Sequence, residues 1–296
     1  MKKIHDSTVR LFCVLGIVTA LAIPDAQAAR HHLHRHALPS SQMALTASTV
    51  LVIDQTTQQV VYSKNPDPIH PIASITKLMT ALVVLETGQN LQEPLTVTEE
   101  DMDTLRFTHS HLRVGAQASR LDFLRMALVA SENRAATALG RSYPGGTRAF
   151  VAQMNAEAER LGMKSTHFED SSGLNGGNVS TARDLAILVE TASKYPLIHE
   201  ITTMASVTVP VGVHGRAMTF HNTNPLVASQ AWDIGLSKTG FINESGQCLV
   251  MQAIINSHPM VIVLLDAHGH HARFNDATRV RKWLEAHNHQ VTVGQL

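Results

Sequence analysis

Apolar residues form short runs near both ends of the chain and longer runs between them. Near the start, residues 49–53 and 59–63 are separated by a polar turn at residues 54–57. Later, residues 232–237, 247–255 and 260–267 are separated by polar stretches rich in Asn, Ser and Gly. Short apolar runs bounded by such turn residues are typical of strands. We therefore expect two strands early and a three-stranded antiparallel meander late.

The middle of the chain, to about residue 204, has the longer apolar runs that helices need. Residues 78–85 are apolar at nearly every position, with Pro71 before them and Gly88 as a plausible end. A helix that is apolar on all sides is buried, so we place this helix at the centre of the domain. A closing amphipathic helix is predicted over residues 275–287, with Val280, Trp283 and Leu284 on one side. Strands at both ends with helices between them predict an α+β fold, with one antiparallel sheet, helices on its faces and a helical subdomain.

The first 28 residues have the pattern of a secretory signal peptide. Lys2, Lys3 and Arg10 precede an apolar run at residues 11–23, which is too short to span a bilayer comfortably. Ala26 and Ala28 complete a small-x-small cleavage site. We expect cleavage after Ala28, then a His-rich flexible linker over residues 29–44, and one domain over residues 45–290. An uncleaved membrane anchor is the alternative interpretation.

Charge and cysteine content exclude several classes of function. The 24 basic and 24 acidic residues balance, which counts against nucleic-acid binding and against an electrostatic membrane clamp. Cys248 is the cysteine that remains after signal cleavage, and it lies on a predicted core strand. We expect it to be an inert buried thiol.

Ser74 and Lys77 form the first candidate catalytic pair. On a helix they stand at positions i and i+3, so they share a face and the amine can reach the hydroxyl. A serine hydroxyl needs an adjacent base to become a good nucleophile. Burial and a second cation, for which Lys238 is the candidate, would lower the pKa of Lys77 and make it such a base. The alternative is a solvated helix lysine.

Ser131 and Asn133 stand between two predicted helices. The first helix opens at Ser119, which with Asp122 resembles a capping box, and the second begins at Asn133. A hydroxyl here could pass a proton to a leaving amine, and a carboxamide could hold a peptide group. Alternatively, both residues only cap the second helix, and the two roles are compatible.

Lys238, Thr239 and Gly240 end the first strand of the predicted meander. A lysine and a threonine on a strand could hold a substrate carboxylate. The glycine would leave room for a peptide to lie along the strand edge. The alternative, a turn lysine before a flexible glycine, is weakened by the apolar strands on both sides.

With these three motifs in this order, the chain resembles the low-molecular-mass penicillin-binding proteins, which are serine D-Ala-D-Ala peptidases. Residues 131–136, 143–146, 180–185, 221–224, 238–241 and 248–251 are similar to the D-alanyl-D-alanine endopeptidase subgroup, and the resemblance covers about residues 45–290. It implies a DD-peptidase/β-lactamase-like fold with a five-stranded antiparallel sheet, a periplasmic location, and peptidoglycan stem peptides and β-lactams as partners. The residue roles that it implies are Ser74 as acylated nucleophile, Lys77 as general base, Ser131 as proton shuttle, Asn133 as substrate contact, Lys238 and Thr239 as carboxylate-binding groups, and the backbone N–H groups of Ser74 and Phe241 as the oxyanion hole.

Other functions compete with cleavage of peptidoglycan cross-links. A D-Ala-D-Ala carboxypeptidase would use the same residues, although the stretch after Gly240 has room for neither an extra β-domain nor a C-terminal amphipathic anchor. A β-lactamase would need a deacylating glutamate, for which Glu169 is a weak candidate because its spacing is wrong. A non-catalytic cell-wall or metal-binding protein would use the histidines at residues 31–36 and 268–271. We expect a solvated tail and a polar turn at those histidines, and no metal or cofactor.

Overall fold

The computed structural model of the protein describes residues 43–211 and 216–287. The predicted signal peptide over residues 1–28 lies outside the described residues, as does the predicted linker apart from residues 43 and 44. The helices and strands below belong to the unit that begins at Ala37.

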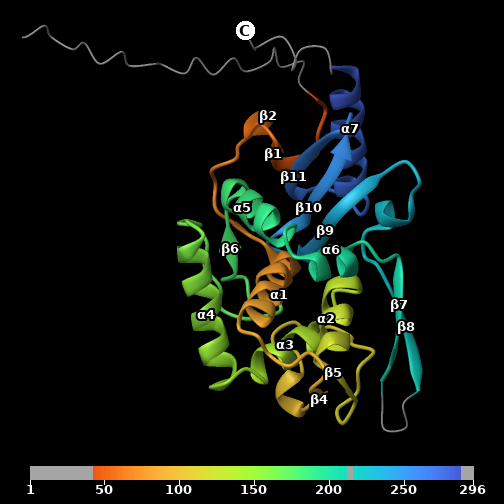
Figure 1. Cartoon of the computed structure of the whole chain (residues 1–296). Helices are drawn as coiled ribbons and strands as arrows, with labels where there is room; N and C mark the ends of the chain where they lie inside the picture. The colour runs from red at the N-terminus through yellow and green to blue at the C-terminus, as the bar shows by residue number, and fades with distance from the viewer. Residues whose placement is uncertain (1–42, 212–215, 288–296) are drawn as a thin grey trace, which may run out of the picture. The chain divides into compact units, whose positions relative to one another are not determined.

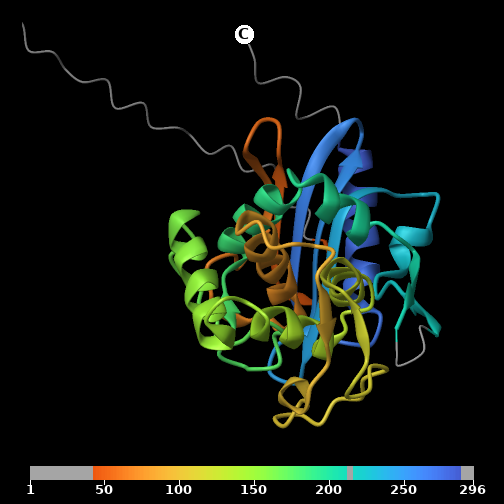
Figure 2. The same ribbon diagram turned by 60° about the horizontal axis from the view of Figure 1, so that its bottom comes forward.

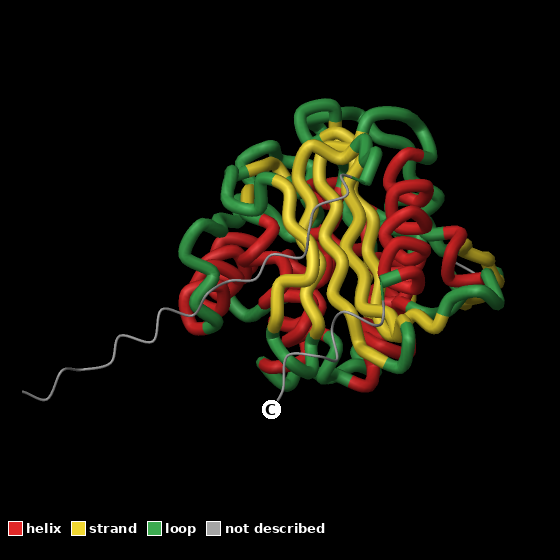
Figure 3. Tube along the Cα trace, turned by 90° about the horizontal axis from the view of Figure 1, so that it is seen from above, coloured by secondary structure: helices red, strands yellow, loops and turns green. Residues whose placement is uncertain are grey.

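Five antiparallel strands lie side by side in the main sheet of the described residues (Figure 3). Their order is β2-β1-β11-β10-β9. These strands are β1 (Ala47–Asp54), β2 (Gln59–Lys64), β9 (Asp233–Ile242), β10 (Gly246–Ile255) and β11 (His258–Ala267). The two early strands and the three-stranded meander predicted from the apolar runs are therefore confirmed. Strand β9 continues through the third motif to Ile242, so Lys238 and Thr239 lie within the strand, at the edge of the sheet.

Helices cover both faces of the sheet, which explains why its inner strands are apolar on both sides (Figure 3). One face, with Val50, Leu249 and Ile262, packs against α7 (Ala272–Ala286). The buried side of α7 includes Val280, Trp283 and Leu284, as predicted. The opposite face belongs to a second apolar cluster, which it shares with the helical region.

Between β2 and β9, the described residues form six α-helices. They are α1 (Thr76–Glu86), α2 (Arg120–Val129), α3 (Asn133–Arg141), α4 (Gly146–Arg160), α5 (Ala182–Ala192) and α6 (Pro196–Thr202). Helix α1 is buried from Thr76 to Val84 and contacts α2, α3, α4 and α5, so the predicted central helix is confirmed (Figures 1 and 2). It ends at Glu86, and Gly88 follows with a φ of +65°, the left-handed conformation that helix ends favour.

Short elements complete the helical region, and the sequence patterns did not predict them. They are the 3₁₀ turns η1 (Ala73–Ile75), η2 (Glu99–Asp101) and η3 (Pro225–Ala228), and the strands β3 (His70–Pro71), β4 (Pro94–Thr96), β5 (Gln117–Ser119), β6 (Val179–Ser180), β7 (Ser206–Pro210) and β8 (Ala217–His221). These strands pair as β3 with β6, β4 with β5 and β7 with β8. The turn η1 matters most for the site, because it places Ser74 between the sheet edge and the start of α1.

Candidate active site

Ser74 and Lys77 are brought together by the turn that leads into α1. Ser74 lies in η1 rather than in the α-helix itself, and Lys77 is the second residue of α1. The Lys77 Nζ atom lies 2.8 Å from the Ser74 Oγ atom, within hydrogen-bond distance. Ala73, directly before the serine, has a φ of +48°, a strained value for a residue with a side chain. The predicted contact between the hydroxyl and the amine is therefore present.

The Lys77 side chain is buried, with 1% of its surface exposed, so it is not a solvated helix lysine. Besides Ser74, its Nζ donates hydrogen bonds to the Asn133 Oδ1 at 2.8 Å and to the Ser172 carbonyl at 2.6 Å. Burial lowers the pKa of Lys77 to about 7, although the carboxylates of Asp170 and Glu132 act to raise it. The predicted direction of the shift and the predicted role of burial are confirmed, whereas the charge of Lys238 is not among the causes.

Ser131 and Lys238 form a second hydrogen-bonded pair. The Lys238 Nζ donates to the Ser131 Oγ at 2.8 Å and to the Thr239 carbonyl at 3.1 Å. Ser131 has a φ of +57°, and this conformation turns the chain sharply between α2 and α3. Burial holds the pKa of Lys238 well below its ordinary value, and the positive charges of Lys77 and Arg273 lower it further. The charge of Lys77 thus helps to lower the pKa of Lys238, whereas burial lowers the pKa of Lys77 itself.

Helix capping at α3 differs from the sequence interpretation. Glu132 is the N-cap residue, and its side chain accepts a hydrogen bond from the backbone N–H of Arg134 at 3.3 Å. Neither Ser131 nor Asn133 is therefore the cap, and their polar atoms serve the two lysines instead. Asn133 also donates through Nδ2 to the Thr108 Oγ1 at 3.1 Å. By contrast, the predicted cap of α2 at Ser119 is confirmed. The Ser119 Oγ accepts a hydrogen bond from the backbone N–H of Asp122 at 3.1 Å.

Gly240 is required by the turn that carries the nucleophile. A Cβ atom at Gly240 would lie 2.7 Å from the Ile72 carbonyl oxygen and 3.3 Å from the Ala73 Cβ. The space that a side chain at Gly240 would enter is therefore occupied by η1. The absence of a side chain lets strand β9 pack directly against the turn that holds Ser74.

Thr239 and Phe241 flank Gly240 along the edge strand. The Thr239 Oγ1 lies 2.7 Å from the Thr223 Oγ1, which fixes the threonine hydroxyl beside Lys238. Phe241 is 54% exposed and borders a hollow at the ends of β9, β10 and β11. Arg273, at the start of α7, borders the same hollow and donates to the Gly240 carbonyl at 2.9 Å. Burial lowers the pKa of Arg273 to about 10.

The loop at residues 170–174 is part of the site, although no motif pointed to it. Its Asp170 carboxylate accepts hydrogen bonds from the backbone N–H groups of Ser172 and Gly173, at 2.7 and 2.5 Å. This turn directs the Ser172 carbonyl at Lys77 and brings Gly173 against Ala73, where a Cβ would lie 2.0 Å from the carbonyl oxygen. The signal in the sequence was an Asp followed by Ser-Ser-Gly, which is ordinary turn chemistry and names no partner.

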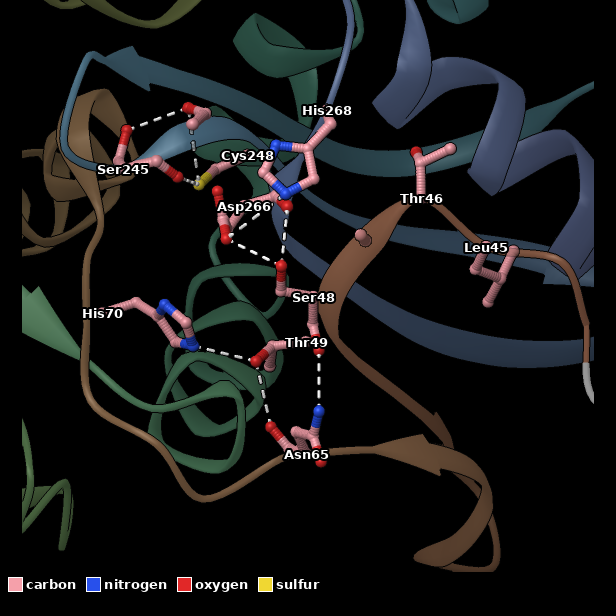
Figure 4. Close-up of polar contacts among 12 residues, drawn as sticks. Leu45, Thr46, Ser48, Thr49, Asn65, His70, Ser245, Cys248, Asp266 and His268 are labelled. Atoms are coloured by element: carbon pink, nitrogen blue, oxygen red, sulfur yellow. Dashed lines mark hydrogen bonds and ion pairs between the residues drawn. The ribbon is translucent and has the colours of Figure 1, made fainter.

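Cys248 and the described histidines add no further reactive group to the site. Burial raises the pKa of the Cys248 thiol to about 11, as expected for an inert cysteine, and Figure 4 shows its sulfur beside Ser245 and Asp266. His268 lies 4.0 Å from the Asp266 carboxylate in the same view. Within residues 43–211 and 216–287, no three His, Cys, Asp or Glu side chains gather where they could hold a metal ion. In the same part of the chain, no helix has the length and apolar character to cross a membrane.

Comparisons with curated proteins identify close relatives over most of the chain. It is 46% identical over 280 residues to a D-alanyl-D-alanine endopeptidase of Pseudomonas aeruginosa, an alignment that covers 94% of this chain and 87% of the relative. It is 43% identical to a D-alanyl-D-alanine endopeptidase of Escherichia coli, with 84% and 80% of the two chains covered. A D-alanyl-D-alanine carboxypeptidase of Streptomyces is 32% identical, over 77% of this chain and 83% of the relative.

Solved structures confirm the fold class. The Streptomyces K15 DD-transpeptidase superposes with a TM-score of 0.76 at 30% identity, covering 82% of this chain and 98% of the other. The cefotaxime-bound penicillin-binding protein D2 of Listeria monocytogenes gives a TM-score of 0.71 at 30% identity, with 80% and 96% covered. The family model described as D-alanyl-D-alanine carboxypeptidase matches residues 36–269. The chain therefore belongs to the S11 family of D-alanyl-D-alanine peptidases.

Proposed function

We propose that the protein is a periplasmic serine DD-peptidase that cleaves D-alanyl bonds in peptidoglycan cross-links through an acyl-enzyme on Ser74. One observation carries the proposal: the Ser74 hydroxyl lies 2.8 Å from a buried lysine amine whose pKa burial lowers to about 7. Such an amine is unprotonated for a large fraction of the time at neutral pH, as a general base must be. The predicted signal peptide supports the periplasmic location.

Acylation begins when Lys77 takes the Ser74 proton and the serine oxygen attacks the carbonyl carbon of the D-alanyl residue. The resulting oxyanion is held by the backbone N–H groups of Ser74 and Phe241. Ser131 passes the proton from Lys77 to the leaving amine, and the C–N bond breaks, which leaves Lys77 neutral again. The proximity of Lys238, whose Nζ lies 2.8 Å from the Ser131 Oγ, favours loss of that hydroxyl proton.

Substrate is held at two opposite ends of the site. Lys238 and Thr239 bind the carboxylate next to the scissile bond on the leaving side. Asn133 binds the peptide group of the acyl donor, and its hydrogen bond to Lys77 links substrate binding to the base. Deacylation follows when a water molecule, deprotonated by Lys77, attacks the ester on Ser74 and releases the donor peptide.

The names of the relatives favour the endopeptidase over the carboxypeptidase. The relatives at 43–46% identity are named endopeptidases, whereas the carboxypeptidases among the relatives compared are 28–32% identical. A β-lactamase is less well supported, because Glu169 is 48% exposed and pairs with His167 at 3.4 Å, facing solvent rather than the serine.

The test is a digest of purified cross-linked muropeptide dimers and D-Ala-D-Ala monomers by the protein beginning at Ala29, read by mass spectrometry. A labelled penicillin titrates the active site in parallel. The proposal predicts dimer cleavage and a stable adduct on Ser74. Loss of only the terminal D-Ala from monomers would identify a carboxypeptidase, and rapid release of hydrolysed penicillin a β-lactamase. Ser74→Ala distinguishes catalysis from cell-wall binding, since it should abolish both the adduct and the cleavage.

A further inference from the structure

The segment at residues 103–112, here called the rim loop, has a defined form without regular secondary structure. The Asp103 carboxylate accepts hydrogen bonds from the backbone N–H groups of Leu105, Arg106 and Thr108, each at 2.9 Å, and from the Thr108 hydroxyl at 2.7 Å. Although burial alone would raise it, these hydrogen bonds hold the pKa of Asp103 below its ordinary value. The loop is therefore organised around one carboxylate and not left free to rearrange.

The rim loop is fastened directly to the second motif of the active site. The Thr108 hydroxyl accepts the 3.1 Å hydrogen bond from Asn133, the residue that also bonds Lys77. Two residues further on, the Ser110 hydroxyl donates to the Glu132 carboxylate at 2.5 Å. The loop thus stands beside the end of the site where Asn133 would hold the acyl donor.

Arg106 ties the rim loop to two other segments that border the site. Its Nε donates to the Leu174 carbonyl at 2.6 Å, in the loop that carries Ser172 and Gly173. Its Nη2 lies 2.9 Å from the Glu244 carboxylate, in the turn directly after β9. A half-exposed ion pair contributes little stability by itself. The main effect of these contacts is therefore to fix the position of the rim loop.

Phe107 lies between these two anchored residues and is 80% exposed. Its φ of +54° places a bulky side chain in the left-handed region, a conformation that persists only where its surroundings enforce it. A single exposed apolar residue is common in proteins, and its neighbour Leu105 is 64% exposed without a positive φ. Strain, exposure and position between Arg106 and Thr108 together distinguish Phe107 from an incidental surface residue.

We propose that Phe107 is a specificity-determining residue that packs its ring against the aliphatic part of the stem peptide on the acyl-donor side. The inference rests on the proposed function and deepens it. Asn133, which would hold the donor peptide, is bonded to the rim loop at Thr108, so the loop lies next to the position of that peptide. A cross-linkable stem carries a diamino acid near the scissile bond, whose methylene chain offers the apolar surface that an exposed aromatic ring would cover.

The experiment compares a long and a minimal ligand in the protein from Ala29. The long ligand is a cross-linked muropeptide dimer, measured as kcat/KM, and the minimal ligand is 6-aminopenicillanic acid, which has no acyl side chain, measured as the acylation rate constant. Phe107→Ala should lower kcat/KM for the dimer about tenfold and leave the acylation rate within twofold. Phe107→Gly, which removes the ring without backbone strain, should do the same even if the alanine variant folds poorly.

Two control variants sharpen the result. Leu105→Ala removes a comparable exposed side chain from the same loop and should change neither rate, and Phe107→Tyr keeps the ring and should retain dimer cleavage. Equal losses with both ligands would overturn the inference, because the loop would then act through Asn133. Unchanged rates in the two ring-deleting variants would overturn it as well. If the unmodified protein cleaved no peptide, the proposed function itself would fail, and this inference with it.

Discussion

Asp276 and the lysine pair Lys77 and Lys238 are buried on opposite sides of the sheet, and their charges are held in opposite ways. On the face covered by α7, Asp276 is fully buried and its Oδ2 accepts hydrogen bonds from the backbone N–H groups of Thr46 and Ala47, at 2.9 and 2.8 Å. Its other oxygen pairs with Arg279 at 2.8 Å. On the face covered by the helical region, Lys77 and Lys238 are equally buried, yet their hydrogen bonds reach neutral oxygens.

This difference distinguishes a buried charge that stabilises the fold from a buried group whose protonation state serves the reaction. A buried carboxylate with a cationic partner and several N–H donors joins β1 to α7 and contributes to the fold. A buried ammonium with neutral acceptors is destabilised in its charged form, so its pKa falls toward neutrality. The second arrangement lowers stability, and proteins keep such groups mainly where chemistry needs them.

The largest effect is expected from Lys77→Arg, which keeps the positive charge but removes the ability to lose a proton. We expect penicillin acylation of Ser74 to fall about 10³-fold, in the range that general bases contribute. The rate is measured with a labelled penicillin, and thermal melting checks the fold.

Lys64→Arg is the matched control, because the Lys64 Nζ only donates to the Ala47 and Leu45 carbonyls, at 2.7 and 3.3 Å. Its acylation rate should stay unchanged. A Lys77→Arg protein that retained the acylation rate within tenfold would show that Lys77 is not the base.

The contact between the nucleophile turn and the 170–174 loop is tested by Gly173→Ala. The new Cβ would lie 2.0 Å from the Ala73 carbonyl oxygen, and φ is +84° at this position. We expect a loss of at least about 3 kcal/mol in the free energy of unfolding, together with most of the acylation rate. Gly115→Ala has a similar φ of +87° but open space around the new Cβ, so it should cost only about 1 kcal/mol and keep acylation. Similar losses of stability in the two variants would mean that backbone strain alone, and not contact with Ala73, explains the need for glycine at position 173.

On the opposite face, Asp276→Ala should affect stability and leave the chemistry intact. It removes the acceptor of two backbone N–H groups and the partner of Arg279, which should lower the free energy of unfolding by about 2–3 kcal/mol. Urea denaturation measures this loss, and kcat/KM of the folded variant should equal that of the unmodified protein. A variant that remained stable but lost activity would contradict the division of roles between the two faces.

The pH dependence of acylation follows from the lowered pKa of Lys77. The neutral amine is the active form, and it predominates above a pKa of about 7. Below that value, the acylation rate should fall about tenfold for each pH unit, and above it the rate should level off. Rates measured between pH 5.5 and 8 with a labelled penicillin test this, and a rate that stayed constant across the range would refute the assignment.

The fold was largely predictable because it depends on patterns that are local in sequence. The strand runs at residues 247–255 and 260–267 correspond to β10 and β11, and the apolar stretch after Ser74 is the central helix. The small pairs β3–β6 and β4–β5 were missed, since strands of two or three residues carry no periodic signal.

Only those parts of the candidate site that consist of motif side chains were predictable from the sequence. The sequence motifs grouped Ser74, Lys77, Ser131 and Lys238, and the structure brings them together in two hydrogen-bonded pairs. The Ser172 carbonyl was not predictable, because a backbone oxygen has no residue signature and its position depends on a distant turn. The contact that excludes a side chain at Gly240 was not predictable either, since the carbonyl oxygen involved belongs to Ile72, far away in sequence.

The smallest effect is expected at Cys248. This residue tests whether burial alone sets the protonation states of side chains on the sheet face that the helical region covers. The same desolvation that lowers the pKa of Lys77 raises that of the Cys248 thiol to about 11, since in both cases burial disfavours the charged form. Native protein from Ala29 should therefore resist alkylation at pH 8, and urea should expose one reactive thiol per chain. Cys248→Ala should cost only about 1 kcal/mol and leave acylation unchanged, because the thiol is bonded to the Ser245 carbonyl and to no catalytic group. Alkylation of the native thiol as fast as that of the unfolded chain would mean that this end of the sheet opens readily. Because β10 contacts η1, the turn that leads to Lys77, the burial argument for Lys77 would then weaken as well.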